Sequence, residues 1–312
     1  MKRIFVFIML FTILFSAANY SLAAKKSKAI RIGVSVMTMQ YPFFKDIVEG
    51  IKTKAGKNVV LNVNDANLNL QTQISAVENF VAQNVDAIIL NAVDGNGISS
   101  ALDAAKEANI PVITVDMRPL KGTYATYIGS DNKLGGRLAG KYAAKYISKN
   151  IKGTANVVLL DNPLSTASVE RIDGFKEAIQ KLPNIKVVAQ KGADTREKFM
   201  AAMEDILVAH PDVNVVFSYS GQGGLGAYDA IVSAGKQDRI MVIGFDATDE
   251  EVEAIKKDSA YKASVIQFPK QLGEMCLDSA LKVISGKKIP QNISVEVGLY
   301  TKDGILKASD LK

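Results

Sequence analysis

Short apolar, β-branched runs alternate with longer segments in which apolar residues recur at helical spacing, from residue 29 onward. The short runs predict strands at Ile30–Val36, Val59–Asp65, Ala87–Asn91, Val112–Asp116, Asn156–Asp161, Ile185–Gln190, Val213–Tyr219 and Ile240–Asp246. The longer segments predict helices near 43–56, 68–83, 98–109, 132–149, 166–181, 196–209, 224–234 and 249–258. Near-continuous apolar strands joined by helices are typical of parallel sheets covered on both faces. Right-handed crossovers then give a doubly wound α/β fold.

The series of predicted elements divides near Gly129–Asn132 into two similar halves. The halves end alike, because Pro111–Asp116 and Met241–Asp246 each complete an apolar strand with an aspartate. We therefore predict two similar doubly wound lobes.

The C-terminal part of the sequence indicates a return from one lobe to the other. A predicted strand at 263–267 is followed by a helix at 270–285 and by a final strand at about 293–300. The predicted lobes are residues 29–130 with 268–291, and residues 131–267 with 292–312.

Residues 1–23 have the organisation of a secretory signal peptide. Lys2-Arg3 forms a charged start, Ile4–Phe15 an apolar run too short to span a bilayer comfortably, and Ser21–Ala23 a small-x-small cleavage site. The only cysteine, Cys276, lies far from that site, so neither a disulfide nor a lipid anchor is expected. These features favour a mature protein in a bacterial periplasm.

Composition and charge exclude several classes of protein. The chain is 48% hydrophobic and 22% charged, which is typical of a globular protein. Its formal net charge is +6, but the lysines are scattered among acidic residues, so no nucleic-acid-binding patch is predicted. With one histidine and one cysteine, the chain is poorly supplied for a Ser-His-Asp triad, a Cys-His pair or a Cys/His zinc site. His210 follows a predicted helix at the amino edge of the sheet, where a capping role is favoured.

Polar residues at the carboxyl ends of the predicted strands are the first binding-site candidates, because ligands of open parallel sheets bind there. Asp116 and Asp246 are the strongest of them. The alternative role of an aspartate at this place is a helix N-cap. That role is disfavoured for Asp246, since Thr248 and Glu251 already form a predicted capping box.

Four other residues are candidates for the same edge. Asn91 ends the third strand and offers both a donor and an acceptor, with an Asx turn as its alternative role. Arg171 lies in the first turns of a helix, where a cation opposes the helix dipole, so a ligand-facing guanidinium is favoured over an exposed surface arginine. Phe43 and Phe44 open the first helix; one is expected in the core and the other at the binding edge.

The segment Gly221–Gly226 fits the pattern G-x-G-x-x-G between a strand and a helix, and Asp246 follows it at the end of the next strand. This pattern predicts, as an alternative, a secreted NAD(P)-dependent oxidoreductase. The motif lies in the middle of the second lobe, however, and no acid–base partner is apparent. A tight turn with close backbone approach is the favoured interpretation.

Taken in order, these residues resemble the periplasmic sugar-binding proteins of the ribose-binding type. The landmarks are Tyr41–Phe44, Pro111–Asp116, Ile128–Asn132 with Gly135-Gly136, Arg171 with Gly174-Phe175, Ala209–Asp212, Gly244–Asp246 and Ile266-Gln267. The similarity covers essentially the whole mature chain. It implies two lobes joined by a three-strand hinge, which close on a monosaccharide in the cleft between them. The liganded protein would then dock on the membrane permease of an ABC transporter.

The resemblance also implies which residues contact the ligand: Tyr41, Phe43, Phe44, Asn91, Asp116, Met117, Arg171, Ser220, Asp246 and Gln267. The phenylalanines would supply aromatic contacts. The amides, the carboxylates and the guanidinium would bind sugar hydroxyls through charge-assisted hydrogen bonds, which leave a ligand that lacks a hydroxyl at a disadvantage.

Four positions depart from the ribose-binding pattern. Tyr41, Met117 and Ser220 stand where asparagine, arginine and asparagine are expected. Thr195 lies near the place of a second aromatic wall, for which Tyr219 or Phe268 would have to substitute. These departures weigh against ribose itself and leave a different pentose, a hexose, a polyol or a furanose-like signal molecule open.

The function expected from the sequence is therefore that of a solute-binding receptor and not of an enzyme. No cofactor, metal or nucleic acid is expected, and a monomer is the default. In some relatives a chemoreceptor is a second partner. A regulator of the lac-repressor type shares the fold by resemblance, but it needs an N-terminal helix-turn-helix where this chain has its signal peptide.

Overall fold

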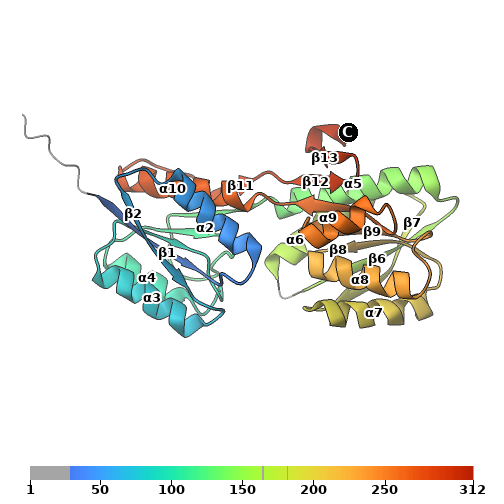
Figure 1. Ribbon diagram of the computed structural model, residues 1–312, viewed down its shortest axis with the longest axis horizontal. Helices are drawn as coiled ribbons and strands as arrows, with labels where there is room; N and C mark the ends of the chain where they lie inside the picture. Colours follow the sequence, from blue (N-terminus) through green and yellow to red (C-terminus); the bar gives the residue numbers. More distant parts are fainter. Residues whose placement is uncertain (1–28, 164, 181, 312) are drawn as a thin grey trace, which may run out of the picture.

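The computed structural model describes residues 29–163, 165–180 and 182–311, and the predicted signal peptide lies outside them. The chain forms two α/β lobes that lie side by side and are joined along one side by crossing segments (Figure 1). Among the described residues, no helix has both the length and the apolar character that a membrane span requires.

The first lobe is built on a six-stranded parallel sheet with the order β11-β5-β4-β3-β1-β2. Its strands are β1 (Ile30–Val36), β2 (Val59–Asp65), β3 (Ala87–Leu90), β4 (Val112–Val115), β5 (Thr126–Ser130) and β11 (Asn292–Val295). Helices α2 (Pro42–Lys54) and α10 (Pro269–Ile284) cover one face, and α3 (Leu70–Ala82) and α4 (Ser99–Glu107) cover the other. Every residue of β3 and β4 is buried, because both faces of these central strands are covered.

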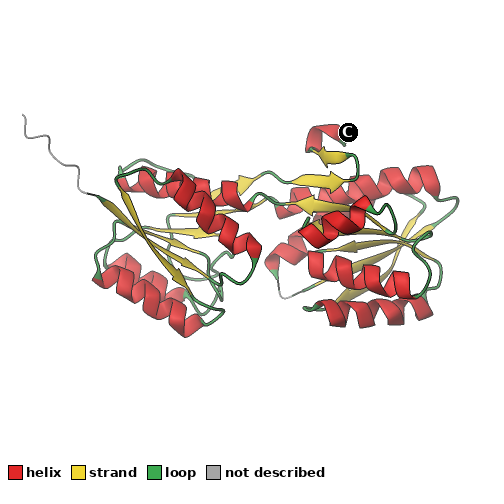
Figure 2. Cartoon of the chain, viewed as in Figure 1, coloured by secondary structure: helices red, strands yellow, loops and turns green. Residues whose placement is uncertain are grey.

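The second lobe has a seven-stranded sheet with the order β13-β12-β10-β9-β8-β6-β7, in which β12 pairs antiparallel to both β10 and β13 and the other described pairs are parallel. Its strands are β6 (Ala155–Asp161), β7 (Ile185–Gly192), β8 (Val213–Ser218), β9 (Met241–Asp246), β10 (Tyr261–Ile266), β12 (Gly298–Thr301) and β13 (Gly304–Leu306). Its helices are α5 (Asn132–Asn150), α6 (Thr166–Ile179), α7 (Arg196–Ala209), α8 (Gly221–Ser233), α9 (Asp249–Lys256) and the 3₁₀ turn η1 (Ala308–Asp310). Helices α5 and α6 pack on one face, and α7, α8 and α9 on the other (Figure 2).

The described chain passes between the lobes three times. It leaves β5 through Asp131 for α5, leaves β10 through Gln267 for α10, and leaves β11 through Glu296–Val297 for β12. The doubly wound, two-lobed α/β fold expected from the sequence is confirmed, and it has three connections.

One predicted lobe boundary is wrong. We expected the second lobe to resume at residue 292, within a single strand at 293–300. Instead, β11 pairs in parallel with β5 of the first sheet, from Asn292 opposite Tyr127 to Val295 opposite Ser130. The third crossing therefore lies at Glu296–Val297. Local apolar pattern predicts an extended segment but does not show that its two ends pair with different sheets.

Helices α5 and α6 cross so closely that glycine is required at the crossing. A Cβ atom at Gly136 would run into the carbonyl oxygen of Arg171, and one at Gly174 would run into that of Lys133. Helices α2 and α10 of the first lobe meet in the same way, through Gly50 and Gly273. The α5–α6 crossing sets the position of Arg171, a residue predicted to bind ligand.

The substitution Gly136→Ala tests this crossing. We expect it to lower the free energy of unfolding by about 1–3 kcal/mol, because the added methyl group forces the helix backbones apart. Urea denaturation measures the change. Gly56→Ala is the matched control, because the surroundings of Gly56 leave open space for a Cβ atom. Equal stability of the two variants would contradict the close crossing.

Candidate functional site

Two aspartates occupy corresponding places at the carboxyl edges of the two sheets, which we call the binding edges. Asp116 directly follows β4, and Asp246 ends β9. Both have left-handed backbones, with φ of +63° and +101°, a conformation that aspartate and asparagine tolerate better than most residues. Neither is the N-cap residue of a helix that follows it in the chain: Thr248 caps α9, and the element after Asp116 is a strand. The alternative N-cap role is therefore wrong for both.

Asn91 holds Asp116 in place. Its amide nitrogen donates to Oδ2 of Asp116 at 3.3 Å and to the Val115 carbonyl at 3.1 Å, and its amide oxygen accepts from the backbone of Met37 at 3.1 Å. The hydroxyl of Tyr127 donates to the Asp116 carbonyl at 2.8 Å. Asn91 is fully buried, so in this form its amide serves the protein itself.

The carboxyl group of Asp116 has a perturbed acidity. Burial raises its pKa to about 6; the positive charge of Arg171 and the hydrogen bond from Asn91 lower the pKa, and the negative charge of Asp246 raises it. Arg171 and Asp246 belong to the other lobe. Their charges act on Asp116, so the two binding edges are electrostatically coupled across the connection between the lobes.

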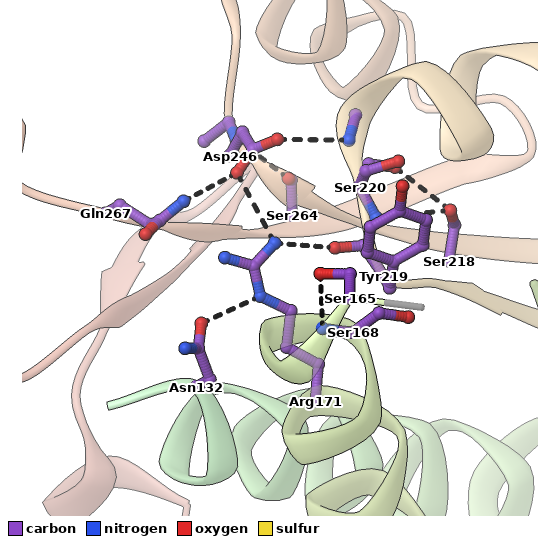
Figure 3. Close-up of polar contacts among 12 residues, drawn as sticks. Asn132, Ser165, Ser168, Arg171, Ser218, Tyr219, Ser220, Asp246, Ser264 and Gln267 are labelled. Carbon is purple, nitrogen blue, oxygen red and sulfur yellow. Dashed lines mark hydrogen bonds and ion pairs between the residues drawn. The ribbon is translucent and has the colours of Figure 1, made fainter. Parts of the chain in front are cut away.

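Arg171 is the central cation of the second binding edge (Figure 3). Its guanidinium carbon lies 3.6 Å from the centroid of the Phe245 ring, and its Nε donates to Oδ1 of Asn132 at 2.9 Å. Its Nη1 donates to the Tyr219 carbonyl at 2.8 Å and lies 3.9 Å from Oδ1 of Asp246. Arg171 is buried, and burial lowers its pKa, but an arginine stays protonated at neutral pH.

The carboxylate of Asp246 is oriented from both sides. Gln267 donates its side-chain nitrogen to Oδ1 at 2.7 Å, and the backbone nitrogen of Gly221 donates to Oδ2 at 3.3 Å. Gln267 is only 8% exposed, and its side-chain oxygen has no hydrogen-bond partner within the described part of the chain. A buried acceptor without a donor is unfavourable, so this oxygen is suited to accept a hydrogen bond from a ligand.

The aromatic pair at the start of α2 divides between a buried and a partly buried ring. Phe44 is buried in the core, and Phe43 is partly buried against it in an edge-to-face contact with centroids 5.4 Å apart. Tyr41 is 53% exposed and lies 6.3 Å from the Phe44 ring. Both Phe43 and Tyr41 therefore retain surface that a ligand could contact.

Four predicted or alternative positions have local structural roles. Ser220 caps α8, with its hydroxyl accepting from the backbone of Gly223 at 3.3 Å. Met117 packs against the core beneath α3 and α4. Thr195 caps α7, and Tyr219 lies with its ring centroid 6.1 Å from that of Phe199. Their contacts with a ligand stay predictions.

The glycines of the segment Gly221–Gly226 face the protein and not an open phosphate site. A Cβ atom at Gly221 would meet Glu251, one at Gly224 would meet Tyr261, and one at Gly226 would meet the carbonyl of Arg196. Asp246, the acid that a dinucleotide motif would direct to a ribose, binds the first nitrogen of the helix instead. The motif therefore serves close packing, as the sequence analysis favoured.

Sequence reasoning gave no role to Asn132 or Phe245, which hold the Arg171 side chain. Both lie within segments that carried the family resemblance, but nothing in the local pattern shows that they meet Arg171. Among the described residues, no group of histidine, cysteine, aspartate and glutamate side chains is arranged to hold a metal ion. His210 ends α7 at the amino edge, as expected.

Comparison with known proteins shows the family of the chain. The model of a family described as periplasmic binding protein domain matches residues 32–288. This chain belongs to that family. It is 36% identical to the ribose import binding protein of Bacillus subtilis over 279 residues, which cover 88% of each chain.

Solved structures show the same relationship. A Mycobacterium smegmatis protein in complex with β-D-fucofuranose is 32% identical, with a TM-score of 0.76 over 88% of this chain and 92% of that one. An ABC transporter solute-binding protein of Bacillus halodurans with bound myo-inositol is 26% identical, with a TM-score of 0.77 over 89% of this chain and 96% of that one.

The acidity of Asp116 can be tested without a ligand. We expect its carboxyl carbon to titrate near pH 6 by NMR, while that of Asp94, whose pKa is lowered by backbone hydrogen bonds from Gly97 and Asn96, titrates below its ordinary range. Because the folded pKa of Asp116 is raised, protonation stabilises the fold. This stabilisation is complete below the unfolded value of about 3.9 and is lost as pH rises through 6. An ordinary titration of Asp116 near pH 4 would contradict the burial.

Proposed function

We propose that this periplasmic binding protein captures a neutral sugar or polyol between its lobes and delivers it to the membrane permease of an ABC transporter. The observation that carries the proposal is the pairing of Asp116 and Asp246, each at a left-handed strand end of its own lobe, with the guanidinium of Arg171 beside them. One lobe alone presents only part of this set, so a ligand that uses all three groups must bridge the lobes.

The chemistry of the set suits vicinal hydroxyl groups. Each carboxylate can accept hydrogen bonds from two hydroxyls, Gln267 offers a buried acceptor, and Arg171 offers donors beyond those already in use. Hydrogen bonds to charged groups are stronger than neutral ones. The ring of Phe43 can pack on the C–H face of a sugar, because an aromatic face is electron-rich.

The charges of the site favour an uncharged ligand. Two carboxylates stand against one guanidinium, and the position after Asp116 is Met117, which brings no second cation. A carboxylate or phosphate on the ligand would be repelled. The relatives fit this proposal, since their names or bound molecules are ribose, β-D-fucofuranose and myo-inositol, all neutral polyhydroxy compounds.

We propose that the two lobes close on the ligand as a hinge. Closure covers the exposed part of Asp116 and Asp246 beside the already buried Arg171. A ligand that lacks one of the bound hydroxyls then leaves a buried charge without a partner, which is costly. This accounts for selectivity among similar sugars. Within the same proposal, residues 1–23 direct export to the periplasm, the mature protein acts as a monomer, and a chemoreceptor is a possible second partner.

The receptor proposal also sets aside the oxidoreductase alternative. The glycines on which that alternative rested are packed against Glu251, Tyr261 and the backbone of α7. A receptor releases its ligand unchanged, which mass analysis of the released compound tests directly.

The site assignment predicts the effect of removing one charge. Asp246→Asn should weaken binding of D-ribose, myo-inositol or whichever neutral sugar of a titration panel binds the wild type, by about tenfold or more in isothermal calorimetry. The control is Asp258→Asn, because Asp258 is also left-handed, at φ +51°, but pairs with Lys262 and Lys302 on the surface. Equal affinities of the two variants would remove Asp246 from the site.

Neutrality of the ligand is tested in the same titration. D-galacturonate and D-ribose 5-phosphate should bind at least about a hundredfold more weakly than the best neutral compound, because each would bring an anion to an acidic site. Preferred binding of an anionic sugar would overturn the charge argument.

Lobe closure is tested by small-angle X-ray scattering of the mature protein. The radius of gyration should decrease when the best neutral compound is added at saturation, and Asp246→Asn should need more of that compound for the same change. A radius that stays constant at saturation would contradict the hinge.

A further inference from the structure

A fully buried carboxylate lies directly behind the second binding edge. Glu251 stands in the first turn of α9, and its Oε2 accepts from the backbone of Thr248 at 2.8 Å, as a capping box requires. Its Oε1 accepts two further hydrogen bonds, from the hydroxyls of Tyr261 and Ser264, each at 2.7 Å. A capping box does not require the Tyr261 and Ser264 hydroxyls, so these two hydrogen bonds indicate a further role for Glu251.

Three glycines make room for the Glu251–Tyr261 pair. A Cβ atom at Gly221 would meet the Glu251 carboxylate, one at Gly224 would meet the Tyr261 hydroxyl, and one at Gly244 would meet both side chains. Glycine inside a helix costs about 1 kcal/mol relative to alanine. The glycine-rich start of α8 therefore lowers the stability of the helix but leaves space for the buried Glu251–Tyr261 pair.

Ser264 connects this pair to Asp246. Its hydroxyl donates to Glu251 and accepts from the backbone nitrogen of Ala247 at 3.0 Å. Asp246 and Ala247 both have left-handed backbones, with φ of +101° and +48°. This conformation is unfavourable for alanine, so the turn needs an external hydrogen bond to hold it. The Ser264 hydroxyl supplies that bond, and Glu251 fixes the direction of the hydroxyl proton.

We propose that Glu251 and Tyr261 are positioning residues that act through Ser264 to hold the Asp246–Ala247 turn in its ligand-binding conformation. The inference rests on the proposed role of Asp246 in binding. It adds that the affinity for a sugar or polyol depends on a carboxylate that does not touch it. It also assigns the glycine-rich segment to the same site.

The electrostatic surroundings make the state of Glu251 sensitive to pH. Burial, and then the negative charge of Asp246, raises the pKa of Glu251 to about 7, while the hydrogen bonds from Tyr261, Ser264 and Thr248 lower it. The groups that face it are Asp246 from β9, Tyr261 and Ser264 from β10, the glycine backbone of α8 and Thr248 of its own capping box. Because the pKa is raised, the stability that protonation contributes is lost as pH rises through about 7.

The experiment compares Glu251→Gln, Tyr261→Phe and Ser264→Ala with the wild type. Each variant is titrated with D-ribose, myo-inositol and the other neutral compounds of the panel, and its free energy of unfolding is measured in urea. The temperature of each titration is chosen so that the variant and the wild type are folded to the same fraction. We expect each variant to bind about fivefold more weakly or worse, since the loss of one hydrogen bond changes an affinity by about fivefold. Ser264→Thr keeps the hydroxyl and should restore the affinity.

Tyr228→Phe is the matched control. The Tyr228 ring lies 5.9 Å from that of Tyr261 in the same core, and among the described residues no hydrogen bond of its hydroxyl is recorded. Loss of that hydroxyl should leave the affinity unchanged. A second readout is the pH profile: the difference in stability between wild type and Glu251→Gln should fall as pH rises through about 7, because glutamine does not titrate.

A third readout needs no ligand. The Ala247 amide should be protected from hydrogen exchange in the wild type, and Ser264→Ala and Glu251→Gln should reduce that protection more than they reduce global stability. The positioning role would be overturned if Asp246→Asn weakens binding but Ser264→Ala and Glu251→Gln leave both the affinity and the Ala247 protection unchanged. If Asp246→Asn leaves the affinity unchanged, the site assignment fails, and the Ala247 exchange rates still decide whether the pair holds the turn.

Discussion

The buried guanidinium of Arg171 is the constraint on which the binding edge of the second lobe depends. A buried cation is tolerated only when surrounding groups replace the water it has lost. Here the Phe245 ring and the Asp246 carboxylate of β9, the Asn132 amide of α5 and the Tyr219 carbonyl after β8 surround it. The glycine-mediated crossing of α5 and α6 brings Asn132 close to Arg171, so helix packing helps to position the guanidinium.

Both lobes place an aspartate with a left-handed backbone at the end of a buried strand, but they hold its side chain in different ways. The first lobe holds its aspartate with the buried amide of Asn91, and the second uses Gln267 and the first turn of α8. Only the second lobe contributes a cation to the pair. Burial raises the pKa of Asp116, and the positive charge of Arg171 from the other lobe lowers it and so favours the ionised form. The charged groups of the two lobes therefore interact at the binding edges.

Much of the fold and part of the site could be predicted from the sequence. The mainly apolar runs Ile30–Val36 and Met241–Asp246 predict buried strands directly, because a strand covered on both faces consists mostly of apolar residues. The aspartates at strand ends were found by the same rule. The roles of Asn91 and Ser220 were harder to predict, since an amide or hydroxyl at a strand end can serve a ligand or the backbone, and spacing does not distinguish the two.

The sequence by itself determined the α/β class, the two lobes and the strand ends at which charged groups would gather, because these follow from local periodicity and from the rule that parallel strands share a carboxyl edge. The tertiary structure decided which groups meet. The pairing of β11 with β5, the stacking of Arg171 on Phe245 and the closeness of Glu251 and Tyr261 to three glycines each join segments far apart in the chain. Such contacts depend on how whole elements pack, and no local pattern of residues records that packing.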